Sequence, residues 1–176
     1  MLNLAIKRPD ATEYAPSYGQ YVSLVAGADI IASLEQQLDE TLALLKSVSK
    51  TMAAFRYQPD KWSAKQLIGH VIDTERVFSY RALRFARGDE TELPGFEGDD
   101  YVNDASFDEP ELDDLAAELE HVRRATISLF RHLGSKAWNR RGVASGNEVS
   151  VRALAYIIAG HELHHREILI NRYLTN

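Results

Sequence analysis

The stretch LDDLAAELEHVRRATISLFRHL, residues 112–133, carries the clearest structural pattern in the chain. Apolar side chains return there at intervals of three and four residues, which is the spacing of one face of an α-helix. That face comprises Leu112, Leu115, Leu119, Val122, Thr126, Leu129, Phe130 and Leu133. We expect Ser106 and Glu109 to form a capping box before this helix, with Pro110 in its first turn. Gly134 is expected to end it.

Three further segments show the same periodicity. Their apolar faces run between residues 31 and 48, between 67 and 85, and between 154 and 168. Ser63 is a suitable N-cap for the second of these helices, and the last is expected to start near Ser150. No segment alternates with period two over a useful length. Four amphipathic helices of about 20 residues each bury their apolar faces most simply against one another. The sequence therefore predicts an all-α protein, a four-helix bundle.

Length and composition fit one ordinary globular domain. The chain has 176 residues, of which 45% are hydrophobic and 26% charged, and these values exclude extended disorder. We predict a single domain over residues 1–176, with an irregular N-terminal arm over 1–28 and the helical bundle over 29–176. The segment from Gly88 to Glu109 is long for a loop in a compact domain, so we expect it to border a functional site.

Cysteine and charge content exclude several functions. Without cysteine, the chain has no disulfide framework, thiolate zinc site or cysteine nucleophile. Twenty basic against 26 acidic residues leave a net charge of −6. We therefore expect no nucleic-acid binding and assign Arg123-Arg124 and Arg140-Arg141 to solvated helix surface. No apolar run approaches the roughly 20 residues of a membrane span, and residues 1–10 lack a targeting pattern. We expect no membrane association and a cytoplasmic location.

Two histidines occupy core positions of the last helix. The apolar face there comprises Leu154, Ile157, Ile158, His161, His165 and Ile168. Burying an imidazole without a partner is costly, at roughly 2–7 kcal/mol. Residues i and i+4 face the same way, so one divalent metal can satisfy both rings. Alternatively, one ring bonds a backbone carbonyl and the other lies at a wet helix end.

The same residues complete an HExxH pattern, His161-Glu162-Leu163-His164-His165. In zinc metalloproteases this pattern supplies two ligands and a glutamate base, and a third ligand follows downstream. Only eleven residues follow His165 here, and Glu167 faces elsewhere on the helix. We therefore do not expect a protease of this type, and a third ligand has to come from upstream.

His70 is the upstream candidate for the third ligand. It lies in the middle of the second helix beside the apolar face, whereas His121 and His132 lie off the apolar face of the third. Metal sites in helix bundles are built from inward-facing side chains on separate helices. His70 and the histidine pair of the last helix would form a three-histidine site with one position open for water or substrate. Alternatively, His70 is a half-buried histidine with an ordinary hydrogen-bond partner.

Two runs of sequence resemble a known family. Residues 61–76, KWSAKQLIGHVIDTER, resemble the second helix of the DinB/YfiT-like metalloenzymes, and residues 160–166, GHELHHR, resemble their last-helix motif. The likeness covers most of the chain, from about Ile30 to Leu174, and includes the loop LPGF at 93–96. Two separate motifs in the right order make the resemblance specific for the family.

The resemblance implies a four-helix bundle, often dimeric, that binds zinc or nickel through His70, His161 and His165. The family includes thiol-dependent transferases and isomerases that use bacillithiol or mycothiol. We therefore expect a homodimeric, divalent-metal-dependent enzyme acting on a small molecule, either a hydrolase or a transferase that uses a low-molecular-weight thiol. Because the chain has no cysteine, the thiol would be a cosubstrate. The alternative is a non-catalytic metal-binding protein of the stress response.

Asp73 and Glu162 are the weak candidates for catalytic residues. Asp73 could be a fourth ligand or orient a histidine, and it could equally form a salt bridge on the helix surface. Glu162 could act as a base, but it points about 100° away from His161 around the helix, which favours a structural role.

Other side chains near the predicted site have simpler expected roles. We expect His164 to pack beside the ligands and Trp62 to lie in the core. Arg81 and Arg84 could receive an anionic substrate, but ordinary surface charge is the expected role. The tyrosines of the arm are expected to pack it against the bundle; they are Tyr14, Tyr18 and Tyr21.

Overall fold

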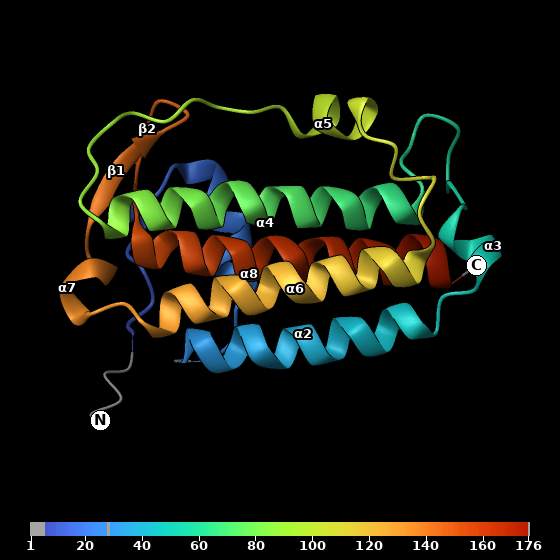
Figure 1. Ribbon diagram of the computed structural model, residues 1–176, viewed down its shortest axis with the longest axis horizontal. Coiled ribbons are helices and arrows are strands. Elements are labelled where there is room, and N and C mark those ends of the chain that lie inside the picture. Colours follow the sequence, from blue (N-terminus) through green and yellow to red (C-terminus); the bar gives the residue numbers. More distant parts are fainter. Residues whose placement is uncertain (1–5, 28, 176) are drawn as a thin grey trace.

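The computed structural model describes residues 6–27 and 29–175, and four long helices form its body (Figure 1). These helices are α2 (Ile30–Lys46), α4 (Ala64–Ala86), α6 (Leu112–Arg131) and α8 (Val151–Ile168). Helices α4 and α2 each pack against both α6 and α8, so the order around the bundle is α2, α6, α4, α8. The predicted all-α four-helix bundle is confirmed.

Shorter elements occupy the ends and connections of the bundle. They are two 3₁₀ turns (Ala11–Glu13 and Pro16–Tyr18), α1 (Gly19–Leu24), α3 (Lys50–Ala53), α5 (Gly98–Asp104), α7 (Ser135–Trp138), β1 (Arg141–Ala144), β2 (Asn147–Ser150) and a π-helical segment (Leu169–Leu174). The strands form an antiparallel hairpin in which Ala144 pairs with Asn147. The N-terminal arm, predicted to be irregular, contains the two 3₁₀ turns and α1, and α1 packs against α8.

The connection between α4 and α6 runs back along the length of α4 (Figure 1). The backbone N–H of Leu93 donates to the carbonyl of Val143 at 2.9 Å, which ties the connection to the hairpin. Helix α5 then packs on α4. As a result α4 and α6 run in the same direction, and α5 lies over the first half of α4, where His70 is (Figure 1).

Local capping explains where the helices begin. The Ser63 hydroxyl accepts from the Gln66 N–H at 3.1 Å, and the Gln66 side chain accepts from the Ser63 N–H at 3.0 Å. Ser150 is the N-cap of α8, which confirms the predicted start of this helix near Ser150. The box predicted at Ser106 and Glu109 is wrong: Glu111 is the N-cap of α6, and the two residues form only a turn.

A layer of buried polar side chains divides the core. One apolar cluster packs the first half of α8 with the end of α4 and the hairpin, and the other packs the starts of α4 and α6. The polar residues between them come from all four long helices and are Gln37, Thr41, Thr74, Glu75, Arg123, Thr126, His161, Glu162 and His165. Buried polar groups need partners, so we expect side chains of this layer to contact one another.

None of the helices in the described part of the chain combines the length and the apolar character needed to cross a lipid bilayer.

Candidate metal centre

Helices α4 and α8 present three histidines to one point. His70 lies in the second turn of α4, and His161 and His165 lie one turn apart on α8. His161 and His165 are only 6% and 8% exposed, and His70 is partly buried. The structure therefore brings together the three residues that the sequence predicts as ligands; the bound metal itself stays a prediction.

The ring nitrogens of the three histidines converge. The Nε2 atom of His161 lies 3.1 Å from Nε2 of His70 and 3.1 Å from Nε2 of His165. One ligand atom of each residue lies within 4.8 Å of the other two. Two imidazoles bound to one tetrahedral zinc, at about 2.0–2.1 Å each, have nitrogens roughly 3.3 Å apart. The three side chains therefore fit a shared divalent ion.

Burial keeps the imidazoles neutral. It lowers the pKa of His165 to about 3 and that of His70 to about 4, although the charge of Asp99 opposes the shift at His70. Burial also lowers the pKa of His161, and the neighbouring histidines lower it further. Neutral imidazole is the form that binds metals. Within the described chain the buried Nδ1 of His165 has no hydrogen-bond partner, so the protein itself leaves part of this cluster unsatisfied.

Aromatic rings enclose the histidines on two sides. The Trp62 ring lies 4.7 Å from the ring of His70 and 6.5 Å from that of His165, centroid to centroid. The Tyr21 ring lies edge-on to His161 at 5.3 Å. Tyr21 belongs to α1, so the N-terminal arm covers one side of the site. Tyr21 thus packs the arm against the bundle, as predicted. Trp62 is half-buried and belongs to the wall of the site rather than to the core alone.

Two glycines permit this close arrangement. A Cβ atom on Gly98, at the start of α5, would lie 2.7 Å from Cε1 of His70. A Cβ atom on Gly160 would lie 2.0 Å from the carbonyl oxygen of Tyr21. The first glycine lets α5 approach the imidazole, and the second lets α1 approach α8 beside His161.

A cavity of about 450 Å³ opens beside the histidines, which is a size suited to a small molecule. His165, Trp62 and Tyr57 form part of its wall. Asp99 and Asn103 of α5 supply polar groups there. The segment between α4 and α6 therefore borders the site, as predicted. The sequence analysis did not single out Asp99 and Asn103. The only indication for them was their position in the long segment that was expected to border a functional site.

The two catalytic candidates have other partners. Asp73 accepts from Nη1 of Arg76 at 3.4 Å, and burial raises its pKa. Asp73 therefore forms the salt bridge on the helix surface that was the alternative to a role at the metal. Glu162 is 3% exposed; its Oε2 accepts from Nη1 of Arg123 at 3.1 Å, and its Oε1 accepts from the Thr41 hydroxyl. With both oxygens engaged, Glu162 fits a structural role better than that of a base.

Two arginines that were expected at the surface are buried. Arg123 is 1% exposed, and its guanidinium bonds carboxylates of α4 and α8. Arg81 is 3% exposed and donates to the Pro94 carbonyl at 2.8 Å and to the Ser145 hydroxyl at 3.0 Å. The surface assignment is wrong for both, because their partners come from distant segments that the local pattern does not show. Arg84 pairs with Asp89 and is partly exposed, as expected.

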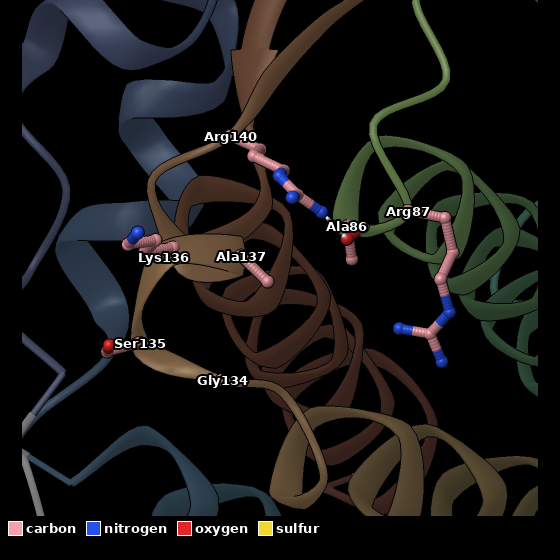
Figure 2. A pocket seen from close by; sticks show the side chains of 7 residues that line it. All are labelled: Ala86, Arg87, Gly134, Ser135, Lys136, Ala137 and Arg140. Atoms are coloured by element: carbon pink, nitrogen blue, oxygen red, sulfur yellow. Dashed lines mark hydrogen bonds between the residues drawn. The ribbon is translucent and has the colours of Figure 1, made fainter.

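A second hollow, of about 510 Å³, lies at the other end of α4, against α7. Figure 2 shows its basic side chains. The guanidinium of Arg140 is turned toward the carbonyl of Ala86, to which it donates, whereas Arg87 points downward in this view and Lys136 points to the left, away from both arginines. These cations do not converge on one point, so we assign no binding site to this hollow.

The fold and the site together define a class, a helical bundle with a three-histidine centre beside a small-molecule cavity. The model of the DinB superfamily matches residues 33–169. The chain belongs to the DinB superfamily, which confirms the resemblance of its two motifs.

Solved structures show the same fold at low sequence identity. YfiT from Bacillus subtilis, described as a probable metal-dependent hydrolase with an unusual four-helix bundle topology, is 16% identical with a TM-score of 0.67, covering 87% of each chain. The DinB-like protein YjoA from Bacillus subtilis is 20% identical with a TM-score of 0.58, covering 80% of this chain and 86% of its own. No curated protein matches the sequence.

Proposed function

We propose that this protein is a divalent-metal-dependent hydrolase of a small molecule. The convergence of three neutral imidazoles, in which Nε2 of His161 lies 3.1 Å from Nε2 of His70 and from Nε2 of His165, carries the proposal. The description of YfiT as a probable metal-dependent hydrolase supports it. The proposed metal is zinc or nickel, the two that the resemblance to the DinB/YfiT-like family implies, and imidazole suits both.

The residues of the chain have distinct parts in this function. When bound, the ion supplies a Lewis acid and an activated water near neutral pH. His70, His161 and His165 would hold it, and three protein ligands would leave a position open for water or substrate. The ring of Trp62 shields the histidines, and Asp99 and Asn103 can hydrogen-bond a substrate in the cavity.

Metal binding is the first test. The protein is stripped with a chelator and titrated with Zn²⁺ or Ni²⁺, and we expect one ion per chain. Replacing one ligand, His161→Ala, should weaken binding by more than about 100-fold, since even residues that only support ligands contribute 10–100-fold. His121→Ala is the matched control, because His121 is exposed on α6. Equal binding by the native protein and His161→Ala would refute the site.

Turnover is the second test. The metal-loaded protein is assayed on a panel of small esters and amides, with and without an added low-molecular-weight thiol. Hydrolysis without the thiol, lost in His161→Ala, is the expected result. Turnover that requires the thiol would assign a transferase instead. Stoichiometric metal binding without turnover of the panel, either with or without the thiol, would favour the non-catalytic alternative.

A further inference from the structure

A buried ionic network crosses the bundle at the level of the histidines. Arg123 on α6 donates from Nε and Nη2 to the Glu75 carboxylate on α4, at 2.9 and 2.8 Å. Its Nη1 donates to Oε2 of Glu162 on α8 at 3.1 Å. The other oxygen of Glu162 accepts from Thr41 on α2. One guanidinium therefore links all four long helices.

The two carboxylates belong to the helices that carry the metal ligands. Glu162 directly follows His161 on α8. Glu75 lies five residues after His70 on α4, about 7.5 Å along the helix axis. The distance between these carboxylates, which Arg123 spans, therefore helps to set the distance between α4 and α8 where the three imidazoles meet.

Stability alone is a weak explanation for this network. The side chains of Arg123, Glu75 and Glu162 are only 1–3% exposed. Burying ions costs several kcal/mol each, and well-packed apolar replacements of such networks are often equally stable or more so. Burial opposes the charge on Arg123, but the attraction of Glu75 and Glu162 raises its pKa, so it remains charged.

What the network supplies, and apolar packing does not, is fixed geometry. A planar guanidinium holds carboxylates in a rigid fork with defined directions. The apolar clusters above and below the layer can repack when a side chain changes, as hydrophobic cores do. Arg123 is therefore the group at this level best suited to hold the ligand helices in register.

We propose that Arg123 is a positioning residue for the metal centre, fixing through Glu75 and Glu162 the separation at which His70 meets His161 and His165. The inference rests on the proposed metal function and goes beyond it. It also gives the glutamate of the HExxH pattern a part in building the site, as an anchor for α8.

Arg123→Lys tests the proposal, because lysine keeps the charge and loses the fork. Co²⁺ is the probe, because its visible absorption reports the coordination geometry. We expect the Co²⁺ dissociation constant to rise by about 10–100-fold, the range for residues that support metal ligands. The absorption spectrum should also change, which a loss of global stability alone would not cause. Arg152→Lys is the matched control: Arg152 lies at the start of α8 and donates to the buried Glu13 of the N-terminal arm, so the change should leave Co²⁺ binding unchanged.

A second variant separates position from stability. Glu75, Arg123 and Glu162 are all replaced by methionine, which should restore a stable core without buried charge. We expect native-like resistance to urea together with weakened Co²⁺ binding and an altered spectrum.

The outcomes distinguish the inference from the proposed function. Native Co²⁺ affinity and spectrum in Arg123→Lys or in the triple variant would overturn the inference and leave the proposed function standing. Failure of both variants to fold would show that the network serves stability, which also overturns it. A native protein that binds no Co²⁺, Zn²⁺ or Ni²⁺ would overturn the proposed function, and the inference with it.

Discussion

The two halves of α8 are both buried, yet they bury opposite kinds of side chain. From Ala153 to Ala159 every residue is apolar and at most 2% exposed. From Gly160 onward the buried positions hold His161, Glu162 and His165. The helix passes from one apolar cluster into the polar layer without a break. Residues 153–159 serve packing, whereas the second half has the side chains that can bind and react.

Each half also has its own ionic anchor. At the start of α8, Oε2 of Glu13 accepts from the Ser150 hydroxyl and from Nε of Arg152, both at 2.7 Å. In the second half, Glu162 bonds Arg123. The first anchor ties the N-terminal arm to the helix, and the second ties the helix through α6 to α4, which carries the third proposed ligand. If this division is correct, changes in the first half alter stability alone, and changes in the second alter metal binding.

Gly160 lies where the two halves meet, and Gly160→Ala should have the largest effect on stability. The new Cβ would stand 2.0 Å from the Tyr21 carbonyl oxygen, and a backbone atom cannot swing aside as a side chain can. We expect the free energy of unfolding to fall by about 3 kcal/mol, the upper part of the range for overpacking. Urea denaturation of the metal-free protein measures it.

Gly134→Ala is the control for that change, because no atom of the described residues lies within 4 Å of the added Cβ and the backbone there is extended at φ −68°. Its stability should be close to native. A Gly160→Ala protein as stable as native would show that α1 does not pack on α8 as closely as the structure has it.

Glu13→Gln should affect stability alone, by about 2 kcal/mol at pH 7, the range for a charged hydrogen bond. Burial raises the pKa of Glu13, but its bonds to Arg152 and Ser150 outweigh this and lower the pKa to about 2. A carboxyl whose pKa is lower in the folded state stabilises above its unfolded pKa, near 4.5, and the gain is lost as the pH falls toward 2.

Urea titrations at pH 7 and pH 3 measure this effect. The native protein should lose more stability on acidification than Glu13→Gln, so the two should approach each other at pH 3. Zn²⁺ affinity at pH 7 should be the same in both. A weaker Zn²⁺ site in Glu13→Gln would break the division between the halves of α8.

The long helices were predictable because their signals are local. The apolar period of α6 is contained in residues 112–133, and the caps at Ser63 and Ser150 lie next to the helices they start. The hairpin of β1 and β2 was not predictable in the same way. Its strands have four residues each, too few to show alternation, and Leu93 bonds to Val143 of the hairpin from 50 residues away in sequence.

The same distinction applies to the site. The spacing of His161 and His165 on one helix face predicted a pair, because the spacing and the face belong to one segment. Predicting His70 as the third ligand required two further steps. One was the expectation that helices of a bundle share metal sites, and the other was the family resemblance of the motif around His70. The partners of Arg123 come from three other helices and are not visible in its own segment, so from its charge alone Arg123 was assigned to the surface.

The sequence does contain one indication that Arg123 is buried. Arg123 lies four residues after Leu119 and four before Ile127, on the buried face of α6. A charged residue at the centre of an apolar face requires compensating charges from neighbouring helices. Glu75 and Glu162 lie at such positions of α4 and α8, but only the packed bundle shows which pairs meet.

Gly98→Ala should have the smallest effect and the most selective one. Its Cβ would stand 2.7 Å from Cε1 of His70, and a free imidazole can turn aside while one that binds a metal cannot. We expect about a tenfold weaker Zn²⁺ site, equal to about 1.4 kcal/mol. Stability without metal should stay level or rise by up to about 1 kcal/mol, since alanine favours the first turn of α5 more than glycine does. Gly19→Ala, whose Cβ would meet only Tyr14 among the described residues, at 4.0 Å, should leave both quantities unchanged. If Zn²⁺ affinity is unaffected by Gly98→Ala, then α5 does not restrain His70, and the site depends on α4 and α8 alone.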